Sequence, residues 1–403
     1  MQTPARFDAL PDYAFPRLRA LLDAHPPGGE PLAMSIGEPT HAYPDFVAET
    51  LAANAHLWGR YPPNEGTAEL REAIAAWLGR RYGAAVDPAR QVLPLNGTRE
   101  GLFMAVTALC PELKNGQRPA VLLPNPFYQC YAAAALAAGA EPVYVNATAE
   151  TGHLPDFAAL PAETLDRAAL VFVCSPANPQ GAVADIGWWT RLLALAERHD
   201  FRVLADECYS ELWRDAPPPG VLQAVAAAGA DPERVAAFHS LSKRSNLAGL
   251  RSGFCVAGPK ATAAMLRLRS YGGAPCPLPA QAVAAACWRD ETHVQTNRDL
   301  YARKYALADE ILGNLPGYAA PDAGFFLWLR VGDGEAAAKT LWTKAGVRAL
   351  PGAYLSRPTP QGDPGKAYLR VALVAPEDQT RRGLQAIAEV LGDRASEVAE
   401  GVA

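Results

Sequence analysis

Short apolar runs alternate with helical periodicity through the middle of the chain. Apolar runs of about four to seven residues predict buried strands, and apolar residues at three- and four-residue spacing predict helices. The expected strands are 92–95, 120–123, 141–145, 170–174, 201–205, 235–238 and 254–257. The expected helices among them include 98–109, 132–138 and 188–199. This alternation predicts an α/β fold with a mostly parallel, seven-stranded sheet between two layers of helices.

The flanking regions have a different pattern. Helical periodicity occurs at 15–23, 46–57 and 68–82, and one long helical pattern extends from 279 to 312. Near the C-terminus, 324–330 and 367–373 alternate apolar and polar residues, which indicates half-buried strands of a smaller α+β domain. A chain of 403 residues is also longer than one ordinary core requires. We therefore expect an N-terminal arm with part of the small domain (1–45), a large domain (46–290) and the remaining small domain (291–403).

Composition and charge exclude several classes of protein. Half of the residues are apolar, and 37 basic against 42 acidic residues give a net charge of −5, which does not favour nucleic acid or an anionic membrane as a partner. The chain has neither an apolar run of membrane-spanning length nor a signal-peptide core near its start. Its seven cysteines and seven histidines form no metal-binding spacing. We expect a cytoplasmic protein with reduced thiols and no metal site.

The most informative stretch is 239–251, His-Ser-Leu-Ser-Lys-Arg-Ser-Asn-Leu-Ala-Gly-Leu-Arg, between two expected strands. Basic and hydroxyl side chains are costly to bury unless they share an anionic partner. A phosphate would satisfy Ser240, Ser242 and Arg251, and a neighbouring carbonyl would condense with the amine of Lys243 to form a Schiff base. Pyridoxal phosphate carries both groups. The alternative is a solvated basic turn.

Polar and aromatic residues also follow other expected strands, where ligands bind in open α/β sheets. Gly97 and Thr98 join a strand to a helix start, which favours anion binding, although such a pair is often only a helix cap. Tyr128 follows the next strand and could stack on a flat ring or belong to the core. Asp206 ends a buried strand, so its carboxylate needs a cation or a protonated base.

Two further loops contain candidate residues. Gly37 is the centre of the turn 35–40, and a glycine allows backbone to approach a ligand closely. An ordinary loop glycine explains the same pattern. Tyr61 begins the loop 61–66, which two prolines stiffen.

Taken together, these motifs resemble the class I/II aminotransferases of the fold-type-I pyridoxal-phosphate superfamily. The shared motifs are Asn178-Pro179-x-Gly181, Asp206-x-x-Tyr209, Ser240-x-Ser242-Lys243 and Arg251. They occur in the order of that family, and the resemblance extends over nearly the whole chain. It implies pyridoxal 5'-phosphate as the cofactor, amino-acid and 2-oxo-acid substrates, and a homodimer with shared active sites.

The resemblance also implies a role for each motif residue. Lys243 would bind the cofactor covalently and then move a proton at the substrate Cα. Asp206 would pair with the pyridine nitrogen, and Asn178 and Tyr209 would hydrogen-bond the phenolic oxygen of the ring. Tyr128 would stack on that ring. The expected phosphate ligands are Gly97, Thr98, Ser240, Ser242, Arg251 and the partner's Tyr61. Arg370 would bind the substrate α-carboxylate through two parallel hydrogen bonds, helped by Asn178 and the backbone of Gly37.

Longer motifs are similar to the proteobacterial N-succinyldiaminopimelate aminotransferases of lysine biosynthesis. The run Lys-Arg-Ser-Asn-Leu at 243–247 is the most distinctive. That family exchanges an amino group between glutamate and N-succinyl-2-amino-6-oxopimelate. Leu268 occupies the position where aspartate-specific members have an arginine, and Gly272 replaces a serine that often reaches the partner's phosphate. The candidates for binding the succinyl carboxylate are Arg99, Arg244, Arg267 and Arg269, which the sequence does not rank.

Three alternatives remain open at this stage. One is another aminotransferase of the same subgroup, acting on aspartate or on an aromatic or kynurenine-type acid. Another is a carbon–sulfur β-lyase on the same fold. The last is a catalytically silent binding or regulatory protein, against which the presence of Lys243, Asp206 and Arg370 argues.

Overall fold

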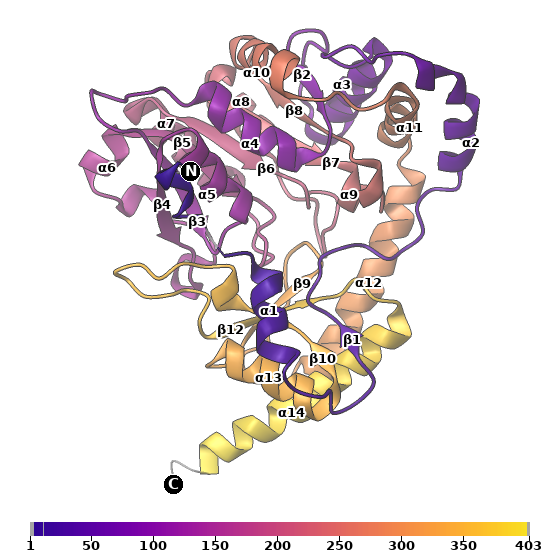
Figure 1. Cartoon of the computed structure of the whole chain (residues 1–403), viewed down its shortest axis with the longest axis vertical. Helices are drawn as coiled ribbons and strands as arrows, with labels where there is room; N and C mark the ends of the chain where they lie inside the picture. The colour runs from indigo at the N-terminus through magenta and orange to yellow at the C-terminus, as the bar shows by residue number, and fades with distance from the viewer. Residues whose placement is uncertain (1–3, 11, 401–403) are drawn as a thin grey trace.

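The computed structural model describes residues 4–10 and 12–400, and it contains a seven-stranded sheet (Figure 1). The strand order is β2-β8-β7-β6-β5-β3-β4. The bounds are β2 Val92–Leu95, β3 Ala120–Asn125, β4 Glu141–Asn146, β5 Ala168–Cys174, β6 Arg202–Asp206, β7 Val235–Ser240 and β8 Gly253–Ala257. Only β8 is antiparallel to its neighbours β2 and β7. The expected mostly parallel sheet is confirmed.

Two layers of helices cover this sheet because successive strand residues face opposite sides. Val121 and Leu123 pack into one apolar core, whereas Leu122 packs into the other. The first core is closed by α4 (Thr98–Leu109), α5 (Gln129–Ala137) and α10 (Pro259–Gly272). The second is closed by α3 (Ala68–Tyr82), α6 (Ala162–Asp166), α7 (Ile186–His199), α8 (Val221–Ala228) and α11 (Leu278–Arg289). Strands buried on both faces explain the continuous apolar runs in the sequence.

A smaller α+β unit lies below the sheet in Figure 1. Its three-stranded antiparallel sheet has the order β11-β12-β9. The bounds are β9 Phe326–Arg330, β11 Leu350–Pro351, β12 Tyr368–Ala372, α12 Thr292–Leu312, α13 Gly334–Ala345 and α14 Glu377–Glu400. The short strand β1 (Leu32–Ala33) pairs in parallel with β10 (Val347–Arg348), so part of the N-terminal segment belongs to this unit. The exact division of the chain into three parts stays a prediction.

The N-terminal helix α1 (Ala14–Leu22) packs on the small unit. Its apolar face buries Leu18 and Leu22 against Trp342 of α13. Because α1 is anchored there, the residues at its start lie beside the large sheet, where the chain crosses from one unit to the other (Figure 1).

Two expected helices are shorter in the structure. The pattern from 279 to 312 forms two helices, α11 and α12, because Asp290 is extended (φ −92°, ψ 131°) and its carboxylate caps the backbone N–H of His293. The carbonyl of Asp290 also accepts a hydrogen bond from Arg244. The pattern from 46 to 57 forms α2 (Phe46–Ala53), whose end is marked by the side chain of Asn54, and then a 3-10 helix, Ala55–Gly59.

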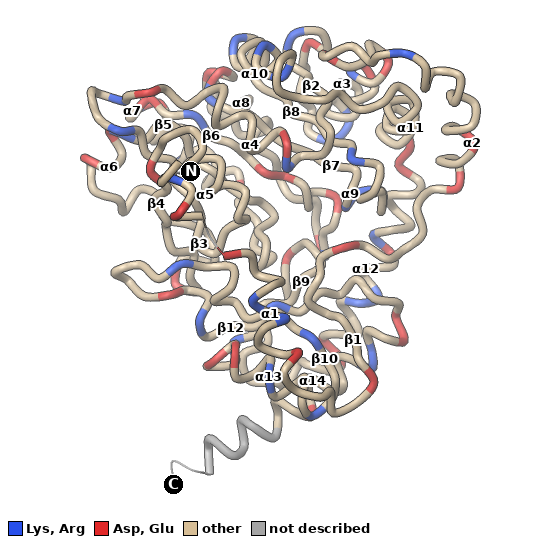
Figure 2. Tube along the Cα trace, viewed as in Figure 1, with Lys and Arg blue, Asp and Glu red and all other residues tan. Residues whose placement is uncertain are grey.

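Acidic and basic residues are mixed along the described trace (Figure 2). None of the described helices combines the length and the apolar character needed to cross a bilayer. Within the same residues, no group of three or more His, Cys, Asp or Glu side chains is gathered as a metal ion requires.

Candidate active site

A cavity of about 300 Å³ lies where the large sheet meets the small unit. Strands β5, β6 and β7 end at this cavity, and Cys174, Asp206 and Ser240 at their carboxyl ends line it. Arg370 of β12 and Phe326 of β9 line it from the small unit. The carboxyl edge of a parallel sheet is the usual ligand site of this architecture.

Lys243 enters the cavity from α9 (Leu241–Arg244), a single helical turn after β7. Ser240 caps this turn, since its hydroxyl accepts a hydrogen bond of 3.1 Å from the backbone N–H of Ser242. The Lys243 amine donates a hydrogen bond to the carbonyl of Gly37. Burial lowers the pKa of Lys243 to about 8, so a larger fraction of the amine is neutral near pH 7 than for an exposed lysine. The neutral amine is the nucleophilic form.

Asp206 is a buried carboxylate at the edge of the cavity. Its Oδ2 accepts a hydrogen bond of 2.6 Å from the hydroxyl of Tyr131, and its Oδ1 accepts one of 3.3 Å from the backbone N–H of Cys208. Burial raises the pKa of Asp206. None of the described cationic side chains lies within ion-pair distance of this carboxylate. A cationic group in the cavity would therefore be a favourable partner for Asp206.

The start of α4 and the guanidinium of Arg251 form a cradle for an anion. Gly97 has φ 82°, and a Cβ at this position would lie 2.3 Å from Nη2 of Arg251, so only glycine permits the close approach. Thr98, Ser240, Ser242 and Arg251 all line the cavity. No carboxylate among the residues that the structure describes forms an ion pair with Arg251, which donates only to the carbonyl of Ala248 at 2.7 Å. A helix N-terminus, three hydroxyls and an arginine suit a phosphate.

Arg370 and Asn178 form a second polar group in the cavity. Arg370 Nη1 donates to the side-chain oxygen of Asn178 at 3.1 Å, and Nη2 donates to the carbonyl of Ser35 at 2.7 Å. Its buried Nε has no hydrogen-bond partner among the described residues. Asn178 also donates to the hydroxyl of Tyr209 at 3.4 Å. Burial lowers the pKa of Arg370 to about 10, and a carboxylate ligand would restore the stability of the charged form.

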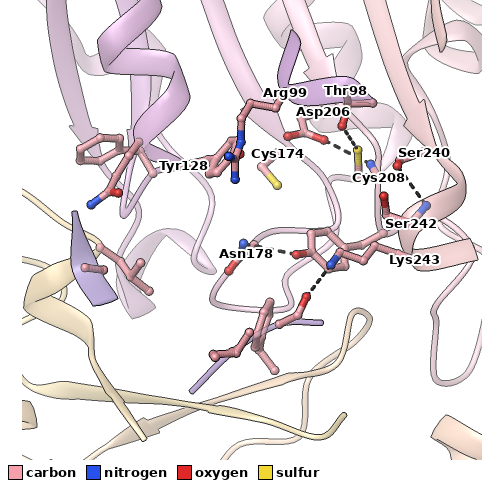
Figure 3. Close-up of a pocket in the computed structure, with 18 of the residues that line it drawn as sticks. Thr98, Arg99, Tyr128, Cys174, Asn178, Asp206, Cys208, Ser240, Ser242 and Lys243 are labelled. Atoms are coloured by element: carbon pink, nitrogen blue, oxygen red, sulfur yellow. Dashed lines mark hydrogen bonds between the residues drawn. The ribbon is translucent and has the colours of Figure 1, made fainter. Parts of the chain in front are cut away.

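Tyr128 lies beside the cavity with its hydroxyl held by Arg99. The Arg99 Nε donates to this hydroxyl at 2.5 Å, and the Tyr128 ring meets that of Tyr131 edge to face at 5.6 Å. Figure 3 shows the Arg99 side chain extending from the start of α4 into the space between Tyr128 and Asp206.

Several lining residues were missed by the sequence interpretation. Tyr131 follows Tyr128 by three residues on α5, a spacing that could have indicated a shared face. Cys208 donates from its thiol to the Thr98 hydroxyl at 3.2 Å. Tyr13 and Phe15 line the cavity from the N-terminal segment, for which the sequence contained no signal.

Two predicted site residues lie outside the lining of this cavity. Gly97 is adjacent to it, behind Arg251. Tyr61 is fully exposed on the single chain, so its expected contact with a phosphate stays a prediction that requires a second chain. Gly272 is exposed as well, and a Cβ there would meet open space.

Comparisons with known proteins identify the family and agree with the fold. The family model for aminotransferase class I and II matches residues 30–387. An aminotransferase structure from Neisseria meningitidis superimposes with a TM-score of 0.93 at 39% identity, covering 96% of this chain and all of the other. A structure described as a probable N-succinyldiaminopimelate aminotransferase from Thermus thermophilus has a TM-score of 0.81 at 26% identity, covering 94% of this chain and all of the other.

Two characterised relatives act on different substrates according to their names. A 4-dedimethylamino-4-oxo-anhydrotetracycline transaminase from Streptomyces rimosus is 35% identical over 88% of this chain and 92% of its own length. An LL-diaminopimelate aminotransferase from Dehalococcoides mccartyi is 32% identical over 96% of this chain and 98% of its own length. With the family model covering most of the sequence, this chain belongs to the class I and II aminotransferases, which use pyridoxal 5'-phosphate.

Proposed function

We propose that this aminotransferase exchanges an amino group between N-succinyl-LL-2,6-diaminopimelate and 2-oxoglutarate, with glutamate as the donor in the biosynthetic direction, in the cytoplasm. The observation that carries the amino-acid part of the proposal is the placement of Lys243, Asp206 and Arg370 around one cavity. The motif at 243–247 and the structure described as a probable N-succinyldiaminopimelate aminotransferase support the succinylated substrate. The LL-diaminopimelate aminotransferase supports a diaminopimelate compound without the succinyl group.

Each polar group of the cavity suits one part of pyridoxal phosphate. The cofactor supplies an aldehyde that bonds to amines and a ring that withdraws electrons from the substrate Cα. Asp206 would keep the ring nitrogen protonated, and Asn178 and Tyr209 would hydrogen-bond the phenolic oxygen. Tyr128 would stack on the ring. Ser240, Ser242, Thr98, Arg251 and the N–H groups at Gly97 would bind the phosphate, together with the partner's Tyr61.

Residues of this chain would then bind and orient the substrate. Arg370 has an unpaired Nε and an outer nitrogen, which can bind a carboxylate through two parallel hydrogen bonds. This would orient the substrate Cα toward Lys243, whose amine would move a proton there when freed from the cofactor. The backbone of Gly37 would help, since its carbonyl already lies within hydrogen-bond distance of the Lys243 amine.

The residues beside the catalytic cavity do not favour an enzyme that acts only on short dicarboxylates such as aspartate. Leu268 is half-buried and lines a second cavity beside the first, at the position where aspartate-specific members have an arginine. Other arginines, Arg99, Arg251 and Arg269, line the same cavity. On the single chain this second cavity measures about 840 Å³, and the expected partner chain would border it near Gly272. Glutamate must bind to the same site, so the pocket must accept two side-chain lengths that both end in a carboxylate.

The proposal is tested by comparing kcat/KM for N-succinyl-diaminopimelate, free diaminopimelate, aspartate and kynurenine, each with 2-oxoglutarate. We expect the succinylated compound to be the best substrate. Removal of the succinyl group should lower kcat/KM at least about tenfold, because one charged hydrogen bond contributes about 1.5–3 kcal/mol. If aspartate or kynurenine is best, the substrate proposal is wrong and the aminotransferase activity remains. Elimination from a cysteine conjugate that outpaces transamination would instead indicate a β-lyase.

A further inference from the structure

The four arginines near the expected side-chain pocket differ in what they contact. Arg244 is buried, and it donates to the carbonyl of Cys287 at 2.6 Å and to the carboxylate of Glu291 at 2.9 Å. Arg269 is buried as well, beside the carboxylate of Glu100 at 3.2 Å. Both guanidinium groups already have acidic partners, and moving either would leave the buried carbonyl of Cys287 or Pro94 without its donor.

Arg267 and Arg99 are exposed, but only one of them faces the active site. Arg267 lies on the outer side of α10 and lines neither cavity. Arg99 lines both cavities, and its side chain lies between Tyr128 and Asp206 (Figure 3). Among the described residues, its side chain donates hydrogen bonds to the hydroxyls of Tyr128 at 2.5 Å and Tyr13 at 3.5 Å, and no carboxylate lies within ion-pair distance.

Arg99 is therefore a cation without an anion at the boundary between the catalytic cavity and its larger neighbour. The neighbouring cavity continues over apolar side chains such as Phe103, Met104 and Leu268. Charged residues, Glu100 and Arg269, line the same cavity. A substrate whose α-amino group reaches Lys243 would extend past Arg99 into this neighbouring cavity. An arginine binds a carboxylate with paired N–H donors, and Arg99 could exchange the neutral tyrosine hydroxyls for that stronger partner.

We propose that Arg99 binds the distal carboxylate of acidic substrates, while Arg370 binds the α-carboxylate. The proposal deepens the proposed function and rests on it for the identity of the long substrate. Within the part of the chain that the structure describes, Tyr128 and Tyr13 hold the Arg99 guanidinium, and neither is charged. Its long side chain can therefore reach a carboxylate at more than one depth. This property explains how one site accepts both glutamate and a substrate extended by a succinyl group.

The test compares amino donors that differ in the distal carboxylate. Glutamate is paired with norvaline, and N-succinyl-diaminopimelate is paired with free diaminopimelate, for wild type, Arg99→Gln and Arg99→Lys. We expect Arg99→Gln to lower the glutamate-to-norvaline ratio of kcat/KM at least about tenfold, the scale of one charged hydrogen bond. Arg99→Lys should retain part of the preference because it keeps the charge without the paired donors. Arg267→Gln is the matched control, because Arg267 is an exposed arginine of α10 that lines neither cavity.

The visible absorption of bound cofactor is recorded for every variant, since Arg99 contacts Tyr128. An Arg99→Gln protein that binds cofactor normally and keeps the wild-type ratio would overturn the proposal. So would an equal loss for glutamate and norvaline, because Arg99 would then act on the whole site. If N-succinyl-diaminopimelate proves inactive while the glutamate ratio still collapses, the substrate proposal is wrong and the role of Arg99 holds. If the succinyl preference persists in Arg99→Gln, the role of Arg99 is wrong and the substrate holds.

Discussion

The hydroxyl of Tyr131 donates a hydrogen bond of 2.6 Å to Oδ2 of Asp206, and both groups are buried. Tyr131 stacks in parallel on Phe172 with ring centroids 4.2 Å apart, so the position of the hydroxyl is fixed by the core. Oδ1 accepts the backbone N–H of Cys208 at 3.3 Å, and the Cys208 side chain also interacts with this carboxylate. Tyr131 thus orients the carboxylate, and it is itself one of the residues that line the cavity.

We expect Tyr131→Phe to lower kcat/KM for transamination by about tenfold or more, because a buried hydrogen bond to a charged group contributes about 1.5–3 kcal/mol. The ring and its stacking remain, so the cofactor should still bind. Steady-state kinetics and the visible spectrum measure the two effects. Tyr318→Phe removes a bond of 2.5 Å to Asp309, far from the cavity, and is the matched control. Equal kinetics for both variants would contradict the orienting role of Tyr131.

Lys243→Ala should abolish the visible absorption of bound cofactor, or shift it, together with transamination. The reason is that Lys243 is the amine that lines the cavity between the anion cradle and Arg370. Absorbance and amino-group transfer are measured on protein supplied with excess pyridoxal phosphate. Lys260→Ala, at an exposed position of α10, should leave both unchanged. A Lys243→Ala protein with normal absorbance and activity would rule out this lysine as the attachment site.

The strands were predictable because burial on both faces requires continuous apolar residues, and no local feature competes with that requirement. Their ends were less predictable. β3 continues to Asn125, whose buried amide is held by Asn146 and by the carbonyl of Arg357, and such distant partners leave no mark in the local sequence. The break at Asp290 was missed for the same reason, since helical periodicity continues across it.

The site could be predicted where chemistry follows a strand directly, as for Asp206 and Lys243. It could not be predicted where tertiary packing decides. Tyr13 reaches the cavity because α1 is anchored on the small unit. The four arginines look alike in sequence, and only the contacts of Arg244 and Arg269 with distant carboxylates set them apart from Arg99.

Cofactor capture by the protein without cofactor should depend on the pKa of Lys243, which burial lowers to about 8. Below that pH the neutral fraction of the amine falls about tenfold per pH unit. For an unperturbed lysine the same fall would begin below about pH 10.4. The capture rate should therefore rise from about pH 7 to about pH 8 and then level off. Stopped-flow absorbance measures the capture rate between about pH 7 and about pH 10. The second ionisation of the cofactor phosphate has a pKa near about 6 and lies below this range. A rate that keeps rising to about pH 10 would contradict the effect of burial.

A second chain is expected to complete each site. Tyr61 is fully exposed, and Trp58 and Tyr271 are also large aromatic residues with exposed side chains. Aromatic residues are enriched at protein interfaces relative to the rest of the surface. We therefore predict a two-fold dimer in which the partner's Tyr61 reaches the phosphate cradle at Gly97 and Arg251.

Mixing of two defective chains tests this arrangement. Lys243→Ala lacks the attachment amine, and Tyr61→Phe lacks the hydroxyl that the neighbouring site needs. In a mixed dimer one site carries both defects and the other carries neither, so random mixing should recover about a quarter of the wild-type sites. Activity is measured after subunit exchange and compared with each variant alone. Activity that is only the sum of the two variants, or a fully active monomer by light scattering, would show that Tyr61 acts within its own chain or not at all.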